Sequence, residues 1–253
     1  MQIYLKSLAL ILIFETILFI VAYFVKRNDL ADVGWGLGFG VVAIFNFVPN
    51  TEPTHMQKVL LIVVLAWSLR LAGYLGFRMI GKSEDQRYQD MRAGWKSLVT
   101  LKSFLYIFIL QGFLLWILAG PIIYYFSEEN LVVSNLSWLA IFFSLFGLVY
   151  ESIADLQKSA FKKIKANSST FIQTGLFKYS RYPQYFGEII FWTGVALFPM
   201  SINIYLGFLY APIFLFILLR FVSGVPLLEK KYITRTGYSN YANKTPLFFP
   251  RIF

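Results

Sequence analysis

The chain contains no cysteine, a single histidine and few charged residues. Among its 253 residues 14% are charged, whereas a soluble domain carries about 25%. Without cysteine there is no disulfide bond, no thiolate metal ligand and no cysteine nucleophile. The one histidine, His55, lies in a short loop before an apolar run. One histidine without cysteine is a poor basis for a zinc, haem or Ser-His hydrolase centre, so no metal site is expected.

Apolar residues dominate instead, with 58% hydrophobic residues, 19% aromatic residues and a mean hydropathy of +0.62. So little polar material cannot cover a water-soluble surface, and lipid must therefore cover much of the exterior. Seven apolar runs suit helices that cross a bilayer, although the sixth is short for a full span. They occupy residues 4–25, 31–48, 58–80, 104–126, 131–154, 185–200 and 203–222. The sequence therefore predicts an all-α membrane protein, a bundle of about seven transmembrane helices in a single domain over residues 1–253.

The net charge of +10 resides mainly in alternate loops. Lys and Arg follow the first, third, fifth and seventh runs, and the other loops nearly lack them. The positive-inside rule then places the N-terminus outside and the C-terminus in the cytoplasm. Anionic lipid headgroups account for these charges better than nucleic acid does, and a dinucleotide cofactor could use the same charges. We expect a multi-pass protein of a bacterial inner membrane, with lipids and a lipophilic small molecule as partners and no obligate protein partner.

Several ionisable side chains fall at or near membrane depth, where they cost several kcal/mol unless a cavity or a partner receives them. Arg70 lies near the middle of the run 58–80 and needs a carboxylate or an anionic ligand. Glu151 and Asp155 are four residues apart and share a helix face. Glu188 lies near the start of the sixth run. These four residues predict either a polar cavity that opens to the cytoplasm or a structural ion-pair network.

Three other polar residues each have a simpler explanation beside a functional one. Arg220 lies near a cytoplasmic helix end and could extend its side chain to the interface. Asp32 could cap the second helix, where a carboxylate meets the helix dipole. Glu15 suits a structural hydrogen bond between helices. The glycines of 34–40 lie in an apolar helix with no preceding strand, so they indicate close helix packing and not a Rossmann turn.

Four stretches resemble a known family. Residues 175–188, GLFKYSRYPQYFGE, closely resemble the signature G-L-(F/W)-x-x-(S/T)-R-H-P-N-Y-F-G-E of the steroid 5-alpha-reductase-like membrane proteins, especially their bacterial branch. The stretch 31–39 fits that branch, as do 67–70 followed by 84–88. The tail 223–231, with 238–241 and a final aromatic-Pro segment, matches as well. The resemblance therefore covers nearly the whole chain with several ordered motifs.

This resemblance implies a membrane reductase that uses NADPH to reduce a carbon–carbon double bond conjugated to a carbonyl, in a steroid- or isoprenoid-like enone. The cofactor would lie among the last three helices and the cytoplasmic loops. The implied cofactor contacts are Asp155, Lys162, Gln184 and Glu188, with Tyr179, Arg181 and Arg220 nearby. Asp32 and Trp67 fall near the family's substrate-carbonyl acid and tyrosine. Arg70, in the same motif as Trp67, is the third catalytic candidate.

The chain departs from the family pattern at these positions. Asp32 stands alone where the steroid enzymes have a Gln-Glu pair, and Trp67 stands in place of a tyrosine. An indole cannot give a proton to an enolate. Asp32, if an apolar site kept it neutral, could stabilise the developing enolate oxygen. Lys162 and Arg181 would pair with the cofactor phosphates.

Two rival functions remain open. A membrane methyltransferase that uses S-adenosylmethionine, of the isoprenylcysteine carboxyl methyltransferase type, shares a looser R-H-P-x-Y-x-G pattern, which residues 181–187 fit together with Glu229, Tyr238 and Tyr241. That family pairs two glutamates, whereas Glu229 is followed by two lysines, so the reductase is favoured. A lipid-binding or transport protein is the second rival. It would be supported by an inverted repeat, and the two halves of the chain show none.

Overall fold

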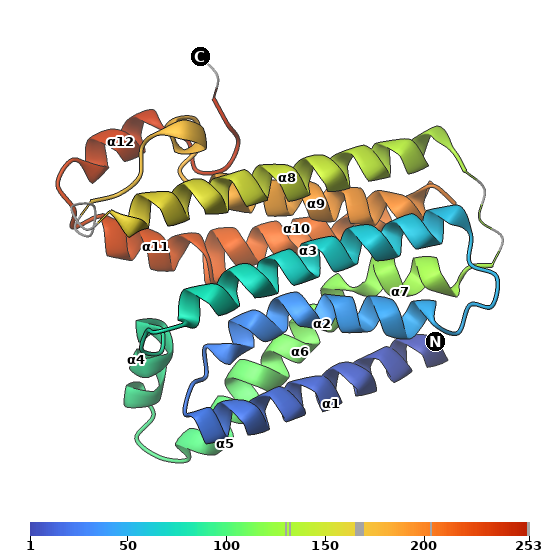
Figure 1. Cartoon of the computed structure of the whole chain (residues 1–253), viewed down its shortest axis with the longest axis horizontal. Coiled ribbons are helices and arrows are strands. Elements are labelled where there is room, and N and C mark those ends of the chain that lie inside the picture. Colours follow the sequence, from blue (N-terminus) through green and yellow to red (C-terminus); the bar gives the residue numbers. More distant parts are fainter. Residues whose placement is uncertain (130, 132, 165–169, 203, 252–253) are drawn as a thin grey trace. The chain divides into compact units, whose positions relative to one another are not determined.

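The computed structural model describes residues 1–129, 131, 133–164, 170–202 and 204–251. Residues 132 and 203, which fall within two of the predicted runs, lie outside this set. The chain divides into two compact units, Met1–Val133 and Ser134–Phe253. Every regular element among the described residues is helical (Figure 1). The all-α prediction is confirmed, and the single domain over 1–253 stays a prediction.

Unit 1 contains three long helices and several short ones. Its elements are α1 (Gln2–Val25), α2 (Leu30–Phe47), α3 (His55–Met79), α4 (Gln86–Gly94), α5 (Val99–Ser103), the π-helix η1 (Phe104–Ile109), α6 (Leu110–Leu118) and α7 (Gly120–Ser127). Two glycines of α2 bring α3 close: a Cβ at Gly36 would lie 3.0 Å from the Ala72 backbone nitrogen, and one at Gly40 would lie 2.6 Å from Ser68 Oγ. The packing role predicted for these glycines is confirmed.

One buried acid links three helices of unit 1. Glu15 of α1 is fully buried, and its Oε1 accepts a hydrogen bond of 3.1 Å from Gln111 Nε2 of α6. The same amide nitrogen also donates to the Ala31 carbonyl of α2 at 2.8 Å. The interhelical hydrogen bond predicted for Glu15 is therefore confirmed.

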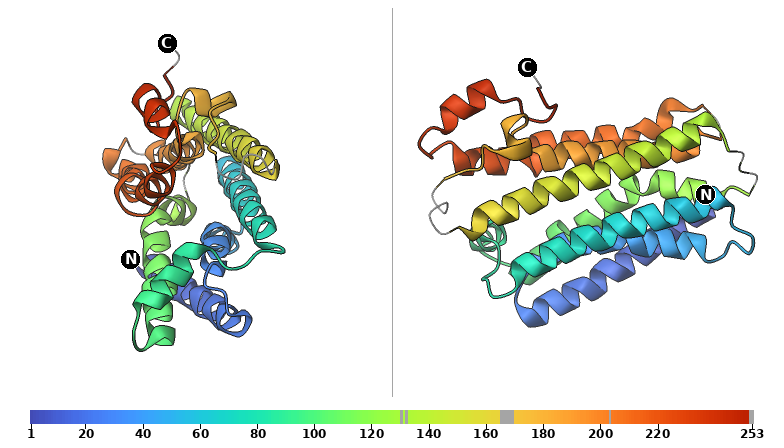
Figure 2. Two further views of the ribbon diagram at one scale, coloured as in Figure 1. Left: turned by 90° about the vertical axis from the view of Figure 1, so that its left-hand side faces the viewer. Right: turned by 45° about the horizontal axis from the view of Figure 1, so that its top comes forward.

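Unit 2 is built on one helix pair. Its elements are α8 (Asn135–Lys163), the 3₁₀ turn η3 (Gly175–Lys178), α9 (Pro183–Met200), the 3₁₀ turn η4 (Leu206–Leu209), α10 (Tyr210–Ile217), the π-helix η5 (Leu218–Val222), α11 (Val225–Tyr232) and α12 (Tyr238–Lys244). Figures 1 and 2 show α8 and α9 side by side. A Cβ at Gly187 would lie 2.6 Å from the Glu151 nitrogen, and one at Gly147 would lie 2.3 Å from the Phe191 nitrogen. Because backbone meets backbone at these glycines, the two helices lie unusually close.

Among the described residues, six helices are long and apolar enough to cross a membrane, which makes this a multi-pass membrane protein. They are Gln2–Val25, Leu30–Phe47, His55–Met79, Val99–Leu118, Asn135–Lys163 and Leu206–Tyr232. The short sixth run of the sequence became α9, whose 18 residues begin with Pro183 and Gln184 and include Glu188. These polar residues reduce its hydropathy, and most of its side chains are buried.

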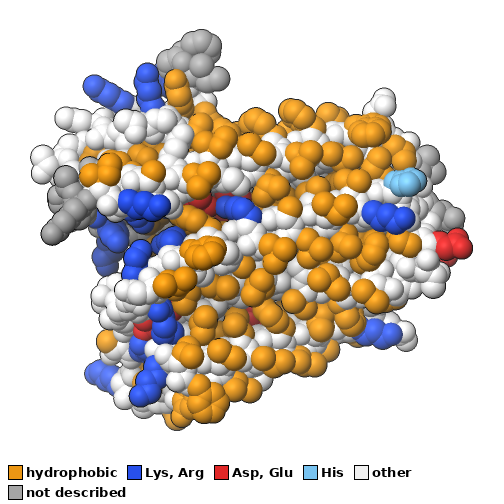
Figure 3. All heavy atoms as spheres, in the orientation of Figure 1, with side chains coloured by type: hydrophobic (Ala, Val, Ile, Leu, Met, Phe, Trp, Pro, Cys, Tyr) orange, Lys and Arg blue, Asp and Glu red, His pale blue; other side chains and the backbone are white. Residues whose placement is uncertain are grey.

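The surface of unit 1 separates apolar from basic side chains. Hydrophobic side chains cover the visible flanks of its long helices, and Lys and Arg gather at the end that carries α4 and α5 (Figure 3). This separation is the one that a bilayer imposes on a spanning bundle. The orientation of the termini stays a prediction.

Candidate functional site

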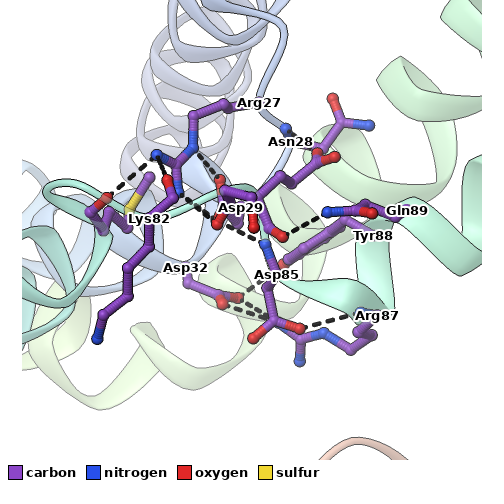
Figure 4. A network of polar contacts seen from close by, with 12 residues as sticks. Arg27, Asn28, Asp29, Asp32, Lys82, Asp85, Arg87, Tyr88 and Gln89 are labelled. Carbon is purple, nitrogen blue, oxygen red and sulfur yellow. Dashed lines mark hydrogen bonds and ion pairs between the residues drawn. The ribbon is translucent and has the colours of Figure 1, made fainter.

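Asp32 forms a compact polar cluster in the first turn of α2. Its carboxylate accepts hydrogen bonds from Arg87 Nη2 at 2.7 and 2.9 Å and from the Tyr88 hydroxyl at 2.7 Å (Figure 4). The Asp32 and Arg87 side chains are each about one third exposed, whereas Tyr88 is buried. The structure thereby joins two stretches, 31–39 and 84–88, that the sequence matched separately to one family.

A second set of contacts fixes the same region. Arg27 binds both carboxylate oxygens of Asp29, at 3.0 and 2.9 Å, and Asp29 also accepts the Asp85 backbone N–H at 3.0 Å (Figure 4). Burial opposes ionisation of Asp29, but the bonds from Arg27 and Asp85 outweigh it and lower the pKa of that carboxyl. Glu84 accepts the Asn28 backbone N–H and pairs with Arg92. The α1–α2 connection is thus tied to the segment before α4.

This geometry bears on the proton-donor role predicted for Asp32. The Asp32 carboxylate accepts hydrogen bonds from a guanidinium and a phenol. Burial, and next the charge of Asp32, raises the pKa of Tyr88 well above its ordinary value, so the phenol keeps its proton. In this arrangement Asp32 is an acceptor that orients Tyr88, and the proton-donor role stays a prediction.

Trp67 and Arg70 lie one turn apart on α3. The Trp67 side chain is fully buried, and its ring meets Phe39 of α2 edge-on, with 5.7 Å between ring centroids. Arg70 is partly buried. Trp67 therefore belongs to the core of unit 1, and the catalytic roles predicted for both residues stay predictions.

The predicted cofactor residues all belong to unit 2. Asp155, Gln184 and Glu188 are buried along the α8–α9 pair. Lys162 lies exposed in the last turn of α8, and Tyr179 is 37% exposed after η3. The remaining two are Arg181, which precedes α9, and Arg220 in η5, whose guanidinium lies 5.0 Å from the Phe221 ring centroid.

Two of these residues, Arg181 and Gln184, line a small cavity of about 20 Å³. The volume suffices for about one water molecule. The other lining residues come from α8, the segment before α9, α11 and α12; they are Lys158, Phe171, Ile172, Phe177, Tyr182, Leu228, Tyr232, Tyr238 and Tyr241. Two cations, an amide and four phenols thus surround one space.

Glu229 of α11 is the acceptor at which three side chains of this cavity wall converge. Its Oε1 accepts hydrogen bonds from Tyr182 Oη at 2.6 Å, Tyr238 Oη at 2.6 Å and Arg181 Nη1 at 2.8 Å. Burial, followed by the bond to Glu229, raises the pKa of both Tyr182 and Tyr238. The phenols therefore remain protonated donors at neutral pH.

The tail completes the site by pairing its backbone with the segment before α9. The N–H groups of Arg181 and Tyr182 donate to the carbonyls of Pro246 and Leu247, at 2.8 and 3.0 Å. The Arg251 N–H donates to the Tyr179 carbonyl at 3.0 Å. This ladder fixes the backbone on which Arg181 and Tyr182 stand. Sequence reasoning matched the tail to a family but did not predict this pairing.

The buried amide of Gln184 points to a missing partner. Neither its Nε2 nor its Oε1 has a hydrogen-bond partner among the described residues, and neither has Arg181 Nε. Leaving a buried polar group unsatisfied costs about 1–3 kcal/mol. A ligand with both donors and acceptors, or an ordered water, would remove that cost.

The donor set suits an anionic group, because the guanidinium, the ammonium of Lys158 and the phenols all present N–H or O–H groups. These residues fit a phosphate of a nucleotide cofactor, although the cavity of about 20 Å³ is far smaller than a dinucleotide. Within the described part of the chain, no group of three or more His, Asp or Glu side chains is placed to hold a metal ion.

Comparison with known proteins gives one match. A family model described as "Protein of unknown function (DUF1295)" matches residues 18–245. No curated protein and no solved structure matches the chain. The matched stretch contains both the Asp32 cluster and the cavity around Arg181.

Proposed function

The chain belongs to the DUF1295 family, and from this premise we propose that it is a membrane-embedded, NADPH-dependent reductase of a conjugated carbon–carbon double bond in a lipophilic enone. The family is steroid 5-alpha-reductase-like, which agrees with the signature in residues 175–188. A steroid- or isoprenoid-like substrate would reach the protein sideways from the bilayer. The basic ends of the helices would face the cytoplasm of a bacterium, where NADPH is available.

The observation that carries this proposal is the unsatisfied Gln184 amide in a cavity that Arg181 and Lys158 also line. A buried amide with a free donor and a free acceptor suits a ligand that also has both, such as the carboxamide or ribose of a nicotinamide nucleotide. The neighbouring cations suit its phosphates. Both classes of group occur in one cofactor.

Several residues would share the binding. Arg181 would hold a phosphate oxygen, Gln184 would orient a polar group, and Lys162, exposed at the end of α8, would attract the cofactor electrostatically. When bound, NADPH supplies the hydride that such a reduction consumes. Asp155 of α8 and Glu188 of α9 are buried and would be further cofactor contacts.

The residues that the resemblance implies for the substrate carbonyl, Asp32 and Trp67, belong to unit 1. Asp32 holds Tyr88 by a 2.7 Å hydrogen bond, and Trp67 gives the neighbouring core an aromatic wall. A developing enolate needs a donor at its oxygen. Of the side chains in this cluster, Arg87 and Tyr88 carry N–H and O–H groups, whereas Asp32 in its present state only accepts.

A methyltransferase that uses S-adenosylmethionine is the second candidate, and one observation favours it. Arg181, Tyr182, Tyr238 and Glu229, which fit the looser methyltransferase pattern, form one hydrogen-bonded group. A cationic sulfonium ligand would find a carboxylate there. The excess of cations around the cavity favours an anionic ligand instead.

Thermal unfolding of the detergent-purified chain with NADPH, NADH, S-adenosylmethionine or no ligand tests the proposal. NADPH at one hundred times its dissociation constant should add about 2.7 kcal/mol of stability. Gln184→Ala should abolish this gain, whereas Gln86→Ala, at an exposed amide of α4, should preserve it. Stabilisation by S-adenosylmethionine alone would overturn the reductase and favour the methyltransferase.

A further inference from the structure

We propose that Glu229 is an internal occupant of an anion-binding position in unit 2, and that an anionic group of the ligand enters by exchanging with its carboxylate. We call this position, formed by Arg181, Tyr182 and Tyr238, the anion seat. The ligand chemistry is a phosphate or a carboxylate. Only the identity of the whole ligand, NADPH, rests on the proposed function.

The first argument is the geometry of the anion seat. Three donors, from the segment before α9 and from α12, approach a single oxygen, Glu229 Oε1, at 2.6, 2.6 and 2.8 Å. The two phenol oxygens are themselves 3.3 Å apart. A guanidinium and two hydroxyl groups that converge on one oxygen form the arrangement that binds oxyanions. Here the oxyanion is part of the chain.

The second argument is space. The cavity beside the anion seat measures about 20 Å³, enough for about one water molecule and too little for a phosphate group. A phosphate can therefore reach Arg181 and the two phenols only if the Glu229 carboxylate leaves them. The Glu229 side chain is 27% exposed, so rotation about its own bonds can turn the carboxylate toward water.

The third argument is what remains unsatisfied while Glu229 occupies the anion seat. Arg181 Nε and both polar atoms of Gln184 are buried without hydrogen-bond partners among the described residues. A carboxylate offers two oxygens, and these do not satisfy all of the neighbouring groups. A phosphate offers more acceptor oxygens and would reach further donors. The exchange would satisfy two N–H groups, those of Arg181 Nε and Gln184 Nε2, that have no partner within the described part of the chain while Glu229 occupies the anion seat.

The anion seat itself is held independently of Glu229. The backbone N–H groups of Arg181 and Tyr182 are bonded to Pro246 and Leu247, and the Ser180 hydroxyl donates to Leu247 at 3.0 Å. The backbone that carries two of the three donors is therefore held without the carboxylate. This separates a displaceable occupant from a structural ion pair, in which both partners hold the fold.

The change in ligand affinity caused by one substitution distinguishes a displaceable Glu229 from a structural ion-pair partner. Glu229→Gln keeps an acceptor oxygen for the phenols and removes the competing charge. Binding of pyrophosphate and of NADPH to the purified full chain, measured by calorimetry, should become about fivefold tighter, the upper range for one partly exposed ion pair. If Glu229 is a structural partner of Arg181, or contacts the ligand directly, binding should weaken or stay unchanged, and either result would overturn the proposal.

Controls separate this effect from charge and folding. Glu129→Gln removes the same charge at an exposed position of unit 1 and should leave both affinities unchanged. Arg181→Gln should abolish pyrophosphate binding both in the otherwise wild-type chain and in the Glu229→Gln variant. If Glu229→Gln does not fold, Glu229→Asp serves instead: its shorter side chain withdraws the carboxylate, and it should also tighten binding.

The two ligands distinguish the two proposals. Tighter pyrophosphate binding without any NADPH binding would support the anion seat and refute the proposed cofactor. If neither ligand binds the wild-type chain or Glu229→Gln, no anion seat exists and the inference is wrong.

Discussion

The close approach of α8 and α9 makes opposite predictions for two alanine substitutions. At Gly187 a Cβ would lie 2.6, 2.8 and 2.9 Å from three atoms of Glu151, two of which belong to its backbone. At Gly73 of α3 a Cβ would meet nothing within 4 Å. The same chemical change is therefore made once against a neighbouring helix and once in open space.

The magnitudes follow from these distances. Alanine is favoured over glycine in a helix by about 1 kcal/mol, so Gly73→Ala should stabilise the protein by up to that amount. At Gly187 the contact must open from 2.6 Å to the roughly 3.4 Å at which ordinary contact begins. A helix backbone cannot rotate away as a side chain can, so overpacking costs typically 1–3 kcal/mol or more and exceeds the helix propensity gain. We expect Gly187→Ala to destabilise unit 2 by about 2 kcal/mol.

Reversible unfolding in mixed detergent micelles, followed by circular dichroism, measures both variants against the wild type. Gly187 also lies between Gln184 and Glu188 on α9, so its variant should weaken pyrophosphate binding while Gly73→Ala preserves it. If the two variants had the same sign and size, helix propensity alone would explain them, and the packing argument would be wrong.

Two further predictions concern the polar clusters. Asp32→Ala should lower the free energy of unfolding by about 2 kcal/mol, because buried Tyr88 loses its acceptor and the one-third-exposed Arg87 loses a weaker pair. Asp90→Ala, at an exposed position on α4, should change it by less than about 0.5 kcal/mol in the same micelle assay. Burial, and next the bond to Glu229, raises the pKa of Tyr182 above 10.0. The contribution of this phenol to the free energy of unfolding is therefore complete below pH 10. It is lost as the pH rises further, because the phenol then ionises only in the unfolded chain. Tyr182→Phe should therefore reduce the fall of stability between pH 10 and 11 by up to about 1.4 kcal/mol per pH unit, and equal slopes in alkaline unfolding curves would contradict this.

The sequence was sufficient for the architecture of long helices, because hydrocarbon imposes a length and a composition that can be read locally. It was also sufficient for the close contact at Gly36 and Gly40, where small residues recur at helical spacing. It missed Gly147, Gly187 and the tight α8–α9 pair, since single glycines in two separate runs carry no common pattern.

The site was less accessible to sequence reasoning, because its contacts join distant segments. Asp32 and Arg87 are 55 residues apart, and Arg181 and Glu229 are 48 apart. A periodic pattern in the sequence does not predict contacts between residues so far apart. The sequence named Arg181 and Gln184 as cofactor contacts, and the structure places both at one cavity. It treated Glu229 and Tyr238 only as members of family patterns and gave them no contact with Arg181. The proton-donor role of Asp32 stays a prediction.

The backbone ladder between the tail and the segment before α9 also has a consequence for the count of membrane crossings. Residues that share hydrogen bonds must face the same compartment, so Tyr179 and Arg251 lie on one side of the bilayer. A chain that leaves a compartment and returns to it crosses an even number of times. The helix Leu206–Tyr232 provides one crossing between these residues. We therefore expect α9 to provide the other crossing, despite its polar first turn and although length and hydropathy alone do not single it out.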